Sequence, residues 1–368
     1  MDDEHPMIEP QPHLAEQTTT LNAVDVYLRV SFSKIYDIDT LNQRFSAEAI
    51  IESKWHDPTR ESAGDDLTHV KNRWRPDLYV ENVVSDLKEE LSAKSVWDGE
   101  LRQVMVSEIR RVRGLFWESL ELAAFPCDIQ DLSLIVTTKK SGKRVNLILM
   151  QPRLAYLSVP NTLEKTMWHL HQVVETEEET IEREYSFGKR DYPAVRLTCQ
   201  AFRLPAYFHW NLMLPILLIT CAALGPFVID YKIPQSRLPS TATMLLSSVS
   251  FKAVIARSLP TVSYLTSLDK YSLGSIAIIT AMLVYHALIA ALSNSCLTLF
   301  GNDLIYYFDK LAFLLFFGLI VSKNLLYFYW LCKIKSYQEN LKLNKLFHHS
   351  KHQSEQSLFT SSNKLKIN

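Results

Sequence analysis

The sequence predicts an all-β sandwich followed by a four-helix transmembrane bundle. Up to about residue 206 the chain is polar and has no long apolar run, whereas apolar segments long enough to cross a bilayer follow one another after it. In the polar part, apolar and polar residues alternate with the period of a β-strand. The formal net charge of −1 argues against a general nucleic-acid binder, which would carry a basic excess.

The composition divides the chain into four regions. Residues 1–20 are rich in Gln, His and Thr and predict a flexible N-terminal tail. Residues 21–206 are expected to form the β-sandwich, a ligand-binding domain if the chain is a receptor, and residues 207–332 the transmembrane domain. Residues 333–368 are rich in Lys, Ser, His and Asn, and we expect a flexible basic C-terminal tail there.

Period-two patterns predict the strands of the first domain. Apolar residues alternate with polar ones over residues 24–32 and again over residues 195–201, so each strand is expected to bury one face. The short apolar runs at 132–136 and 145–150 are separated by turn residues, among them Ser-Gly-Lys at 141–143. Several such strands without long helical patterns favour an antiparallel sandwich.

Membrane spans are expected at about 208–229, 238–259, 272–292 and 311–332. A hydrocarbon core of ~30 Å needs roughly 20 helical residues, and each segment fits that length. The alternative is a buried helical bundle in a soluble protein, which such a row of apolar segments disfavours. The first 20 residues show no secretory signal, and the lysines after Cys332 favour a cytoplasmic tail, so orientation stays open at this point.

The second span differs from the others because it carries a stripe of polar residues. Steps of three and four residues place one set on the same helix face, namely Ser240, Thr243, Ser247, Ser250, Val254 and Arg257. Such a stripe suits a helix that lines water, although a close helix–helix seam also uses Ser and Thr. Lys252 and Arg257 need water, a partner or the membrane interface. One such helix cannot enclose a pore, so several subunits would each contribute one.

Five sequence segments in the same order resemble the pentameric ligand-gated ion channels, the Cys-loop receptor superfamily. They are IYDIDTLNQ (35–43), WRPD (74–77), FPCDIQDLSL (125–134), AFRLPAYFHWNLMLPILLIT (201–220) and SLPTVSYLTSLDKYSLG (258–274). The resemblance covers roughly residues 21–332. It implies a homo- or hetero-pentamer of like subunits in contact with membrane lipid, a multi-pass location in the plasma membrane, and an unknown small-molecule or ionic agonist.

The chain departs from the family at the loop that gives the superfamily its name. The two cysteines that close this loop in the family align with Glu118 and Leu132, so that disulfide is absent here. Cys127 lies inside the loop and has no obvious partner. In this respect the chain is similar to prokaryotic members of the family.

The resemblance also implies which residues couple the ectodomain to the pore. It places Asp39, Leu41, Phe125, Pro126, Asp128 and Arg203 at the junction between the domains, where they would press on the link that contains Pro260. We expect Asp128 and Arg203 to form a partly buried charge pair.

The pore-lining positions implied by the family pattern are Ser236, Pro239, Thr243, Leu246, Ser250, Val254 and Arg257. A ring of Leu246 would be a hydrophobic gate that closes by dewetting. The inner mouth has no acidic residue, and Arg237 and Arg257 would favour anions in a ring of subunits, with Asp230 and Asp269 as counterweights. We therefore expect a chloride-type channel.

The agonist site is the least determined part of the resemblance. Tyr185 and Tyr192 match the two tyrosines of the last hairpin, but Glu81 and Lys139 stand where amine receptors have aromatic residues. A cation–π cage is therefore incomplete. The nearby acidic run at 175–184 is either a solvated loop or a site for Ca²⁺, protons or a cationic ligand.

No motif supports an enzyme, a cofactor, a catalytic residue or a metal site. The function implied is a ligand-gated channel subunit whose pore is lined by its second transmembrane helix. The alternatives are a non-conducting membrane receptor or auxiliary subunit, and a cation-conducting or proton-gated member of the same family.

Overall fold

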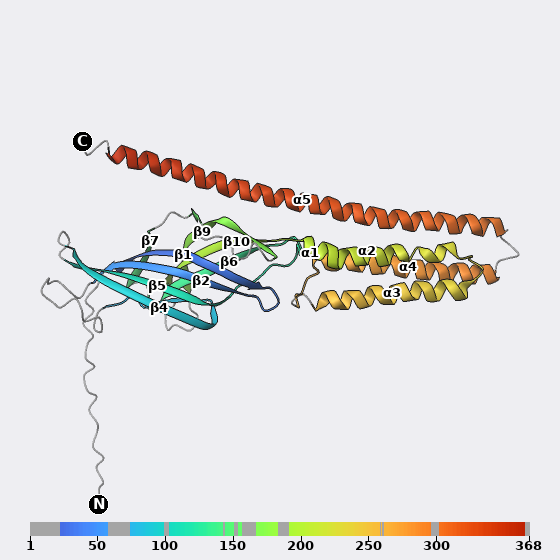
Figure 1. Cartoon of the computed structure of the whole chain (residues 1–368), viewed down its shortest axis with the longest axis horizontal. Helices are drawn as coiled ribbons and strands as arrows, with labels where there is room; N and C mark the ends of the chain where they lie inside the picture. The colour runs from blue at the N-terminus through green and yellow to red at the C-terminus, as the bar shows by residue number, and fades with distance from the viewer. Residues whose placement is uncertain are drawn as a thin grey trace, which may run out of the picture.

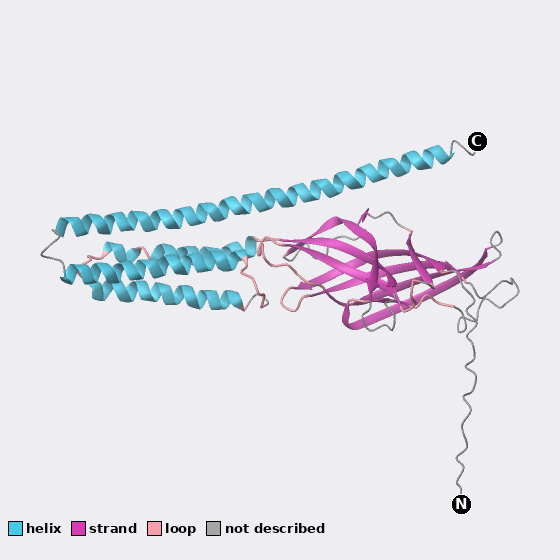
Figure 2. Ribbon diagram, turned by 180° about the vertical axis from the view of Figure 1, so that it is seen from behind, coloured by secondary structure: helices cyan, strands magenta, loops and turns pink. Residues whose placement is uncertain are grey.

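The computed structural model describes residues 23–57, 74–98, 103–142, 144–150, 154–156, 167–182, 191–257, 259, 261–295 and 302–364. These residues form a β-sandwich and a helical bundle that follow one another along the long axis of the molecule (Figure 1). Figure 2 shows the same division from behind, with all strands in one half and the bundled helices in the other. The predicted fold class is confirmed.

Two five-stranded sheets make up the sandwich. The first has the order β4 (Val83–Asp98), β5 (Gln103–Trp117), β2 (Arg44–His56), β1 (Val24–Asp39) and β7 (Val145–Leu149). The second has the order β3 (Leu78–Val80), β6 (Ile129–Thr138), β10 (Asp191–Arg203), β9 (Trp168–Glu182) and β8 (Leu154–Tyr156). The described pairs are antiparallel except β1 with β7, which is parallel. The expectation of a purely antiparallel sandwich is therefore wrong at this one pair.

Alternating burial fixes the register of the strands. In β1 the apolar residues from Val26 to Phe32 are buried at every second position, and the residues between them are exposed. A shift of one residue would turn this whole apolar set toward water. Trp55 of β2 is 1% exposed and packs edge-on against Trp74 with ring centres 6.3 Å apart.

The bundle begins where β10 ends. Its elements are α1 (Ala206–Phe208), η3 (His209–Met213), α2 (Leu214–Ala222), η4 (Gly225–Val228), α3 (Pro234–Ala256), α4 (Ser267–Ser295) and α5 (Asn302–Lys364). The segments long and apolar enough to cross a membrane are Ala206–Val228, Pro234–Ala256, Ser267–Leu292 and Leu304–Asn340. The described part of this membrane protein thus contains four helices that can span a bilayer, as predicted.

The C-terminal segment differs from the expectation of a flexible tail after residue 332. The backbone continues α5 as one helix to Lys364. No proline or glycine follows Gly318, so nothing in the sequence stops the helix. Figures 1 and 2 show α5 passing the bundle and continuing beside the sandwich, so the tail lies on the ectodomain side and not opposite to it.

Candidate functional site

The junction between the domains is built around a buried ion pair. Arg203, the last residue of β10, donates from Nε to Asp128 Oδ1 at 2.7 Å and from Nη2 to Oδ2 at 3.1 Å. Both side chains are almost fully buried, and Gln130 Nε2 donates a further hydrogen bond to Asp128 at 2.5 Å. The expected contact between Asp128 and Arg203 is therefore present, and its two-point geometry is the strong form of this interaction.

Aromatic rings surround the guanidinium of Arg203. Its Cζ lies 4.1 Å from the ring centre of Trp168, 4.9 Å from that of Phe125 and 5.7 Å from that of Phe208. Phe125 belongs to the ectodomain loop and Phe208 to α1, and their rings meet edge-on with centres 4.7 Å apart. The ion pair therefore lies where the first membrane span contacts the ectodomain, held by cation–π contacts as well as hydrogen bonds.

The loop that contains Phe125, Pro126 and Asp128 also contacts the link after α3 and the helix α5. Leu122 N donates to the Tyr264 hydroxyl at 2.8 Å, and Ser267 N donates to the Ala123 carbonyl at 3.1 Å. Gln338 Nε2, on α5, donates to the Cys127 carbonyl at 3.0 Å. The sequence did not predict the contact with Gln338, because a flexible tail was expected at that position.

Apolar packing joins the same parts. Leu122 and Phe125 of the loop form one buried cluster with Phe208 of α1, Ile255 of α3 and Leu268 of α4. A displacement of the loop would therefore disturb the packing of α1, α3 and α4, since close-packed interiors transmit strain.

Polar side chains hold the base of the loop, at the position where the family resemblance leads one to expect a disulfide. Glu118 Oε2 accepts a hydrogen bond from Ser133 N at 2.7 Å, one residue beyond Leu132. Gln130 forms two bonds with the backbone of Glu121, as acceptor from its N at 3.1 Å and as donor to its O at 2.8 Å. Burial raises the pKa of Glu118 above its ordinary value, although the Ser133 bonds oppose this. The closure at the base of this loop is therefore non-covalent.

Cys127 lies inside this loop as a free and buried thiol. Its desolvation, together with the charge of Asp128, raises the pKa of Cys127 to about 12. The thiolate, which is the reactive form of cysteine, is therefore disfavoured at neutral pH. Cys127 is a packing residue in this structure.

Of the other expected coupling residues, Asp39 and Leu41 belong to the turn between β1 and β2. Asp39 closes its own turn, since it accepts bonds from Asn42 and Arg44. Burial alone would raise the pKa of Asp39, but these bonds outweigh it and lower the value. Leu41, at the tip of that turn, is 51% exposed. Pro260 lies outside the described residues, so its role stays a prediction.

All seven expected pore positions lie on one exposed face of α3. Ser236, Pro239, Thr243, Leu246, Ser250, Val254 and Arg257 are exposed in the isolated chain. The opposite face carries Arg237, Thr241, Ser248 and Ile255, which are buried against the rest of the bundle. The helix thus has a clean division between a packed side and an unpacked side that carries hydroxyls.

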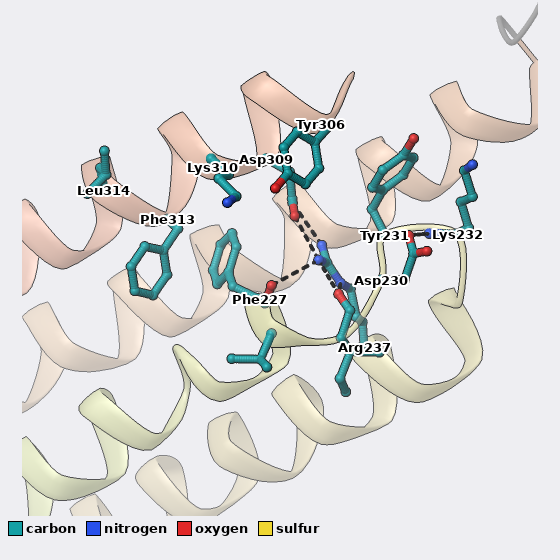
Figure 3. Close-up of a pocket in the computed structure, with 12 residues that line it drawn as sticks. Phe227, Asp230, Tyr231, Lys232, Arg237, Tyr306, Asp309, Lys310, Phe313 and Leu314 are labelled. Carbon is teal, nitrogen blue, oxygen red and sulfur yellow. Dashed lines mark hydrogen bonds and ion pairs between the residues drawn. The ribbon is translucent and has the colours of Figure 1, made fainter. Parts of the chain in front are cut away.

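Arg237 does not point toward that unpacked side, so one premise of the anion prediction is wrong. Its guanidinium is 2% exposed and binds Asp309 of α5 at 2.8 and 2.7 Å, as Figure 3 shows. It also donates to the carbonyls of Ile229 and Phe227, and the Tyr285 hydroxyl donates to Asp309 at 3.3 Å. An arginine one helical step from Ser236 faces about 100° away from it, which brings Arg237 to the packed side.

The remaining cations of this helix differ in their surroundings. Lys252 Nζ forms an ion pair with Asp269 Oδ1 of α4 at 3.0 Å, which supplies the partner that a charge in this span requires. Asp269 accepts hydrogen bonds from Lys252 and Thr266, so its negative charge is neutralised by Lys252 and does not compensate the charge of Arg257. Arg257 lies exposed at the ectodomain end of α3.

The expected agonist residues that are described lie around the distal part of the second sheet. Glu81 and Lys139 are exposed and follow β3 and β6, whereas Tyr192 near the start of β10 is 9% exposed. Tyr185 lies outside the described residues. Next to Lys139, Lys140 Nζ lies 4.3 Å from the ring centre of Trp74, so a cation–π contact fixes the WRPD segment.

Most of the acidic run lies in a regular strand and not in a loop. Glu175 to Glu182 belong to β9, where Glu179 pairs with Arg196 and Glu178 accepts a bond from Leu149 N. Among the described residues no group of His, Cys, Asp or Glu is arranged to hold a metal ion. Cross-strand pairing is thus one structural role of these carboxylates.

No family model matches the chain. Curated relatives include the neuronal acetylcholine receptor subunit alpha-9 of Rattus norvegicus, 23% identical over 278 residues, 70% of this chain and 54% of the relative. The alpha-10 subunit of the same species is 25% identical over 284 residues, which cover 73% of this chain and 59% of that relative. The alpha-4 subunit of Mus musculus is 23% identical over 278 residues, which cover 72% of this chain and 42% of that relative. The chain spans about half the length of the curated relatives it matches.

Proposed function

Because this chain is homologous to subunits of the Cys-loop receptor superfamily, we propose that it is a subunit of a pentameric ligand-gated ion channel in the plasma membrane. Five copies, or copies together with like subunits, would surround an axis. Each would contribute the exposed face of α3 to the wall of the pore. An agonist bound to the ectodomain would open that pore through the junction loop.

The observation that carries the proposal is the two-sided character of α3. Its packed side is satisfied within the chain, since Arg237 binds Asp309 and Lys252 binds Asp269. Its other side leaves hydroxyls and Arg257 without a covering element. The Thr243 and Ser247 hydroxyls donate to carbonyls four residues back, which leaves their oxygens able to accept from water. A closed ring of subunits gives this face an aqueous surface.

The junction supplies a route from the ectodomain to the pore. The loop around Asp128 is fixed to the first span through Arg203 and Phe208, and to the link after α3 through Tyr264 and Ser267. A ligand that favours one position of this loop would shift the equilibrium between two positions of α3. Leu246, 68% exposed in the single chain, would form the hydrophobic constriction.

We further propose that the channel selects anions, although fewer residues support this selectivity than the sequence suggested. Arg237 no longer contributes, and the support is the exposed Arg257 together with the lack of any carboxylate within α3. A ring of Arg257 would lower the energy of anions at the ectodomain mouth. Reversal potentials measured under a chloride gradient decide this, and potentials that follow the cation gradient would contradict it.

The agonist is proposed to bind between subunits, near Tyr185, Tyr192, Glu81 and Lys139. The two exposed charges in this set favour a polar or ionic ligand over one held only by an aromatic cage. A screen of homomeric channels over pH, amines, amino acids and divalent ions would identify it. Loss of the response in Glu81→Ala and Lys139→Ala, with surface expression unchanged, would support the assignment.

Cysteine accessibility tests the proposed pore directly. In a background with Cys221, Cys296 and Cys332 replaced by Ala, Ser250→Cys should react with a charged, membrane-impermeant thiol reagent and alter the current. Ser248→Cys is the matched control because Ser248, two residues away, is 4% exposed and faces the bundle. Equal reactivity at both positions would contradict the assignment. Normal pentamers without current would instead support a non-conducting receptor.

A further inference from the structure

The outward side of the β4–β5 pair carries mostly basic residues. Directly opposed residues on antiparallel strands point to the same side of a sheet. Val106 and Val112 of β5 are buried in the core, so the β5 residues at alternate positions point away from the sandwich, together with their partners on β4. The described charged residues on this side, which we call the β4–β5 face, are Lys88, Glu90, Lys94, Arg111 and Arg113.

Most of the positive charge on the β4–β5 face has no carboxylate partner. Glu90 is its one described carboxylate, and this residue forms an ion pair with Arg111 at 3.9 Å. Among the described residues, no carboxylate forms an ion pair with Lys88, Lys94 or Arg113. All three side chains are exposed, so the β4–β5 face presents uncompensated positive charge to water.

The second sheet carries the opposite charge on its outward side. Glu175, Glu177 and Glu179 alternate along β9, and Thr176 between them is buried. Arg196 of β10 is the described cation beside this row, and it already pairs with Glu179 at 2.9 Å. The positive charge of the β4–β5 face is therefore a local feature, since the whole chain has a formal net charge of −1.

The two charged sides lie on opposite sides of the molecule with respect to α3. Figures 1 and 2 show α3 on the lower side, together with β4 and β5, and α5 on the upper side with β9, which it contacts. In the proposed pentamer the free face of α3 is turned toward the axis, which leaves α5 on the outside. The β4–β5 face then lies around the same axis, on the ectodomain side of the pore.

This inference rests on the proposed function and adds a determinant of its ion selectivity. We propose that the β4–β5 face lines the space in front of the pore and concentrates small inorganic anions, such as chloride, at its entrance. Each unpaired cation would occur once per subunit around that space. A space walled by charge of one sign focuses the electric field and raises the local concentration of counter-ions. The β4–β5 face would thus act before Arg257, at the mouth of α3, is reached.

The rate of thiol modification tests the surface potential without any current. Ser92 of β4 is exposed and lies on the β4–β5 face, opposite Ile109 and between Lys88 and Lys94 along the strand. The purified pentamer with Ser92→Cys, in the background without Cys221, Cys296 and Cys332, is treated with an anionic sulfonatoethyl or a cationic trimethylammonioethyl methanethiosulfonate. The anionic reagent should be favoured. Lys88→Gln/Lys94→Gln should lower the ratio of the two rate constants about fivefold at ~0.1 M salt.

Single-channel recording tests the consequence for permeation. Lys88→Gln/Lys94→Gln should reduce the chloride conductance roughly two- to threefold at ~0.1 M salt. At ~1 M salt the variant and the wild type should conduct alike, because the Debye length falls to about 3 Å. A loss of conductance that is the same at both salt concentrations would show a change of pore structure and would overturn the proposal.

The matched control removes two exposed lysines from the opposite side of the molecule. Lys333→Gln/Lys335→Gln on α5 carries the same change of net charge, and both its rate ratio and its conductance should equal those of the wild type. Equal effects of the two double variants would show a general charge effect and overturn the proposal, as would a rate ratio that Lys88→Gln/Lys94→Gln leaves unchanged. A wild type without current would instead contradict the proposed channel, while the rate ratio would still decide the charge of the β4–β5 face.

Discussion

Two buried arginines stand at opposite ends of the bundle, and their surroundings differ. Arg203 joins Asp128 at the ectodomain junction, and Arg237 joins Asp309 at the remote end. Three aromatic rings enclose Arg203, whereas backbone carbonyls of Ile229 and Phe227 share the donors of Arg237. The side chain of Asp128 is 1% exposed, against 10% for that of Asp309.

This comparison shows that the same pair of residue types can serve two purposes. The first pair joins a loop of the ectodomain to the start of the membrane domain, so it lies on the proposed route of the gating signal. The second pair joins α3 to α5, and thereby sets which face of α3 is left for the proposed pore. In both places a bidentate pair satisfies a charge that would otherwise be too costly to bury.

The largest expected effect is that of Arg203→Ala. The substitution leaves Asp128 buried with Gln130 as its remaining side-chain donor, and the cost should be about 3–5 kcal/mol. We expect the variant to abolish currents or pentamer assembly, measured by patch clamp and by size-exclusion chromatography. Arg196→Ala is the control, because its pair with Glu179 joins β10 to β9 and involves no residue assigned to coupling. Normal gating in Arg203→Ala would contradict the role assigned to this pair.

The sequence predicted the first pair but not the second, for a physical reason. Asp128 stands in the FPCDIQ segment and Arg203 at the entry to the first span, so a local motif marked each one. Asp309 lies just before the fourth span expected from the sequence and Arg237 near the start of α3, and no sequence signal indicated that these two residues pair. The polar stripe of α3 predicted a side that faces water, but it gave no information about the partner of Arg237 on the packed side.

The fold shows the same limit. Alternation within β1 and β10 is a local signal, and the structure has both as strands. The parallel pairing of β1 with β7 depends on how distant strands meet, which local alternation does not determine. The continuation of α5 was missed because composition suggested disorder, while the lack of Gly and Pro permitted a helix.

A smaller effect is expected at the second pair, and it can separate packing from permeation. Arg237→Ala should cost about 3 kcal/mol, the lower end of the range for a broken buried pair, because Asp309 has more contact with solvent. The double variant Arg237→Met/Asp309→Leu should recover most of this loss, since a well-packed apolar pair often replaces a buried ion pair. Thermal unfolding of the purified protein measures both.

Reversal potentials complete that test. If Arg237 is a packing residue, the double variant should conduct with the same ion selectivity as the wild type. Arg257→Gln, by contrast, should reduce the preference for anions, because Arg257 is exposed at the ectodomain end of α3. A changed selectivity in the double variant would show that Arg237 reaches the permeation path after all.

Glu118 closes the base of the junction loop by a hydrogen bond, and its contribution to stability can be measured. Glu118→Ala leaves Ser133 N without its acceptor and should lower stability by about 1–3 kcal/mol. Glu118→Gln keeps an acceptor oxygen and should lose less than about 1 kcal/mol. Thermal unfolding at pH 7 ranks the two variants, and equal losses would show that the Ser133 bond is not what holds the loop base.

The pH dependence of the same residue has a definite sign. Burial raises the folded-state pKa of Glu118 above its ordinary value of 4.5, so the native state binds this proton more tightly than the unfolded state does. The resulting stability is fully present below the unfolded pKa and is lost as the pH rises through the folded value. On acidification from neutral pH, the wild type should therefore gain stability relative to Glu118→Gln.

The smallest effect is expected at the exposed pair Asp39–Arg44, which closes the β1–β2 turn. Its side chains are 28% and 38% exposed, so Arg44→Ala should cost at most about 1 kcal/mol. The hydrogen bonds from Asn42 and Arg44 lower the pKa of Asp39, so this contribution is present at neutral pH and is lost as the pH falls through the folded value. If Arg44→Ala instead abolished gating while leaving the unfolding temperature unchanged, the turn itself would belong to the coupling route, beside the loop of Asp128.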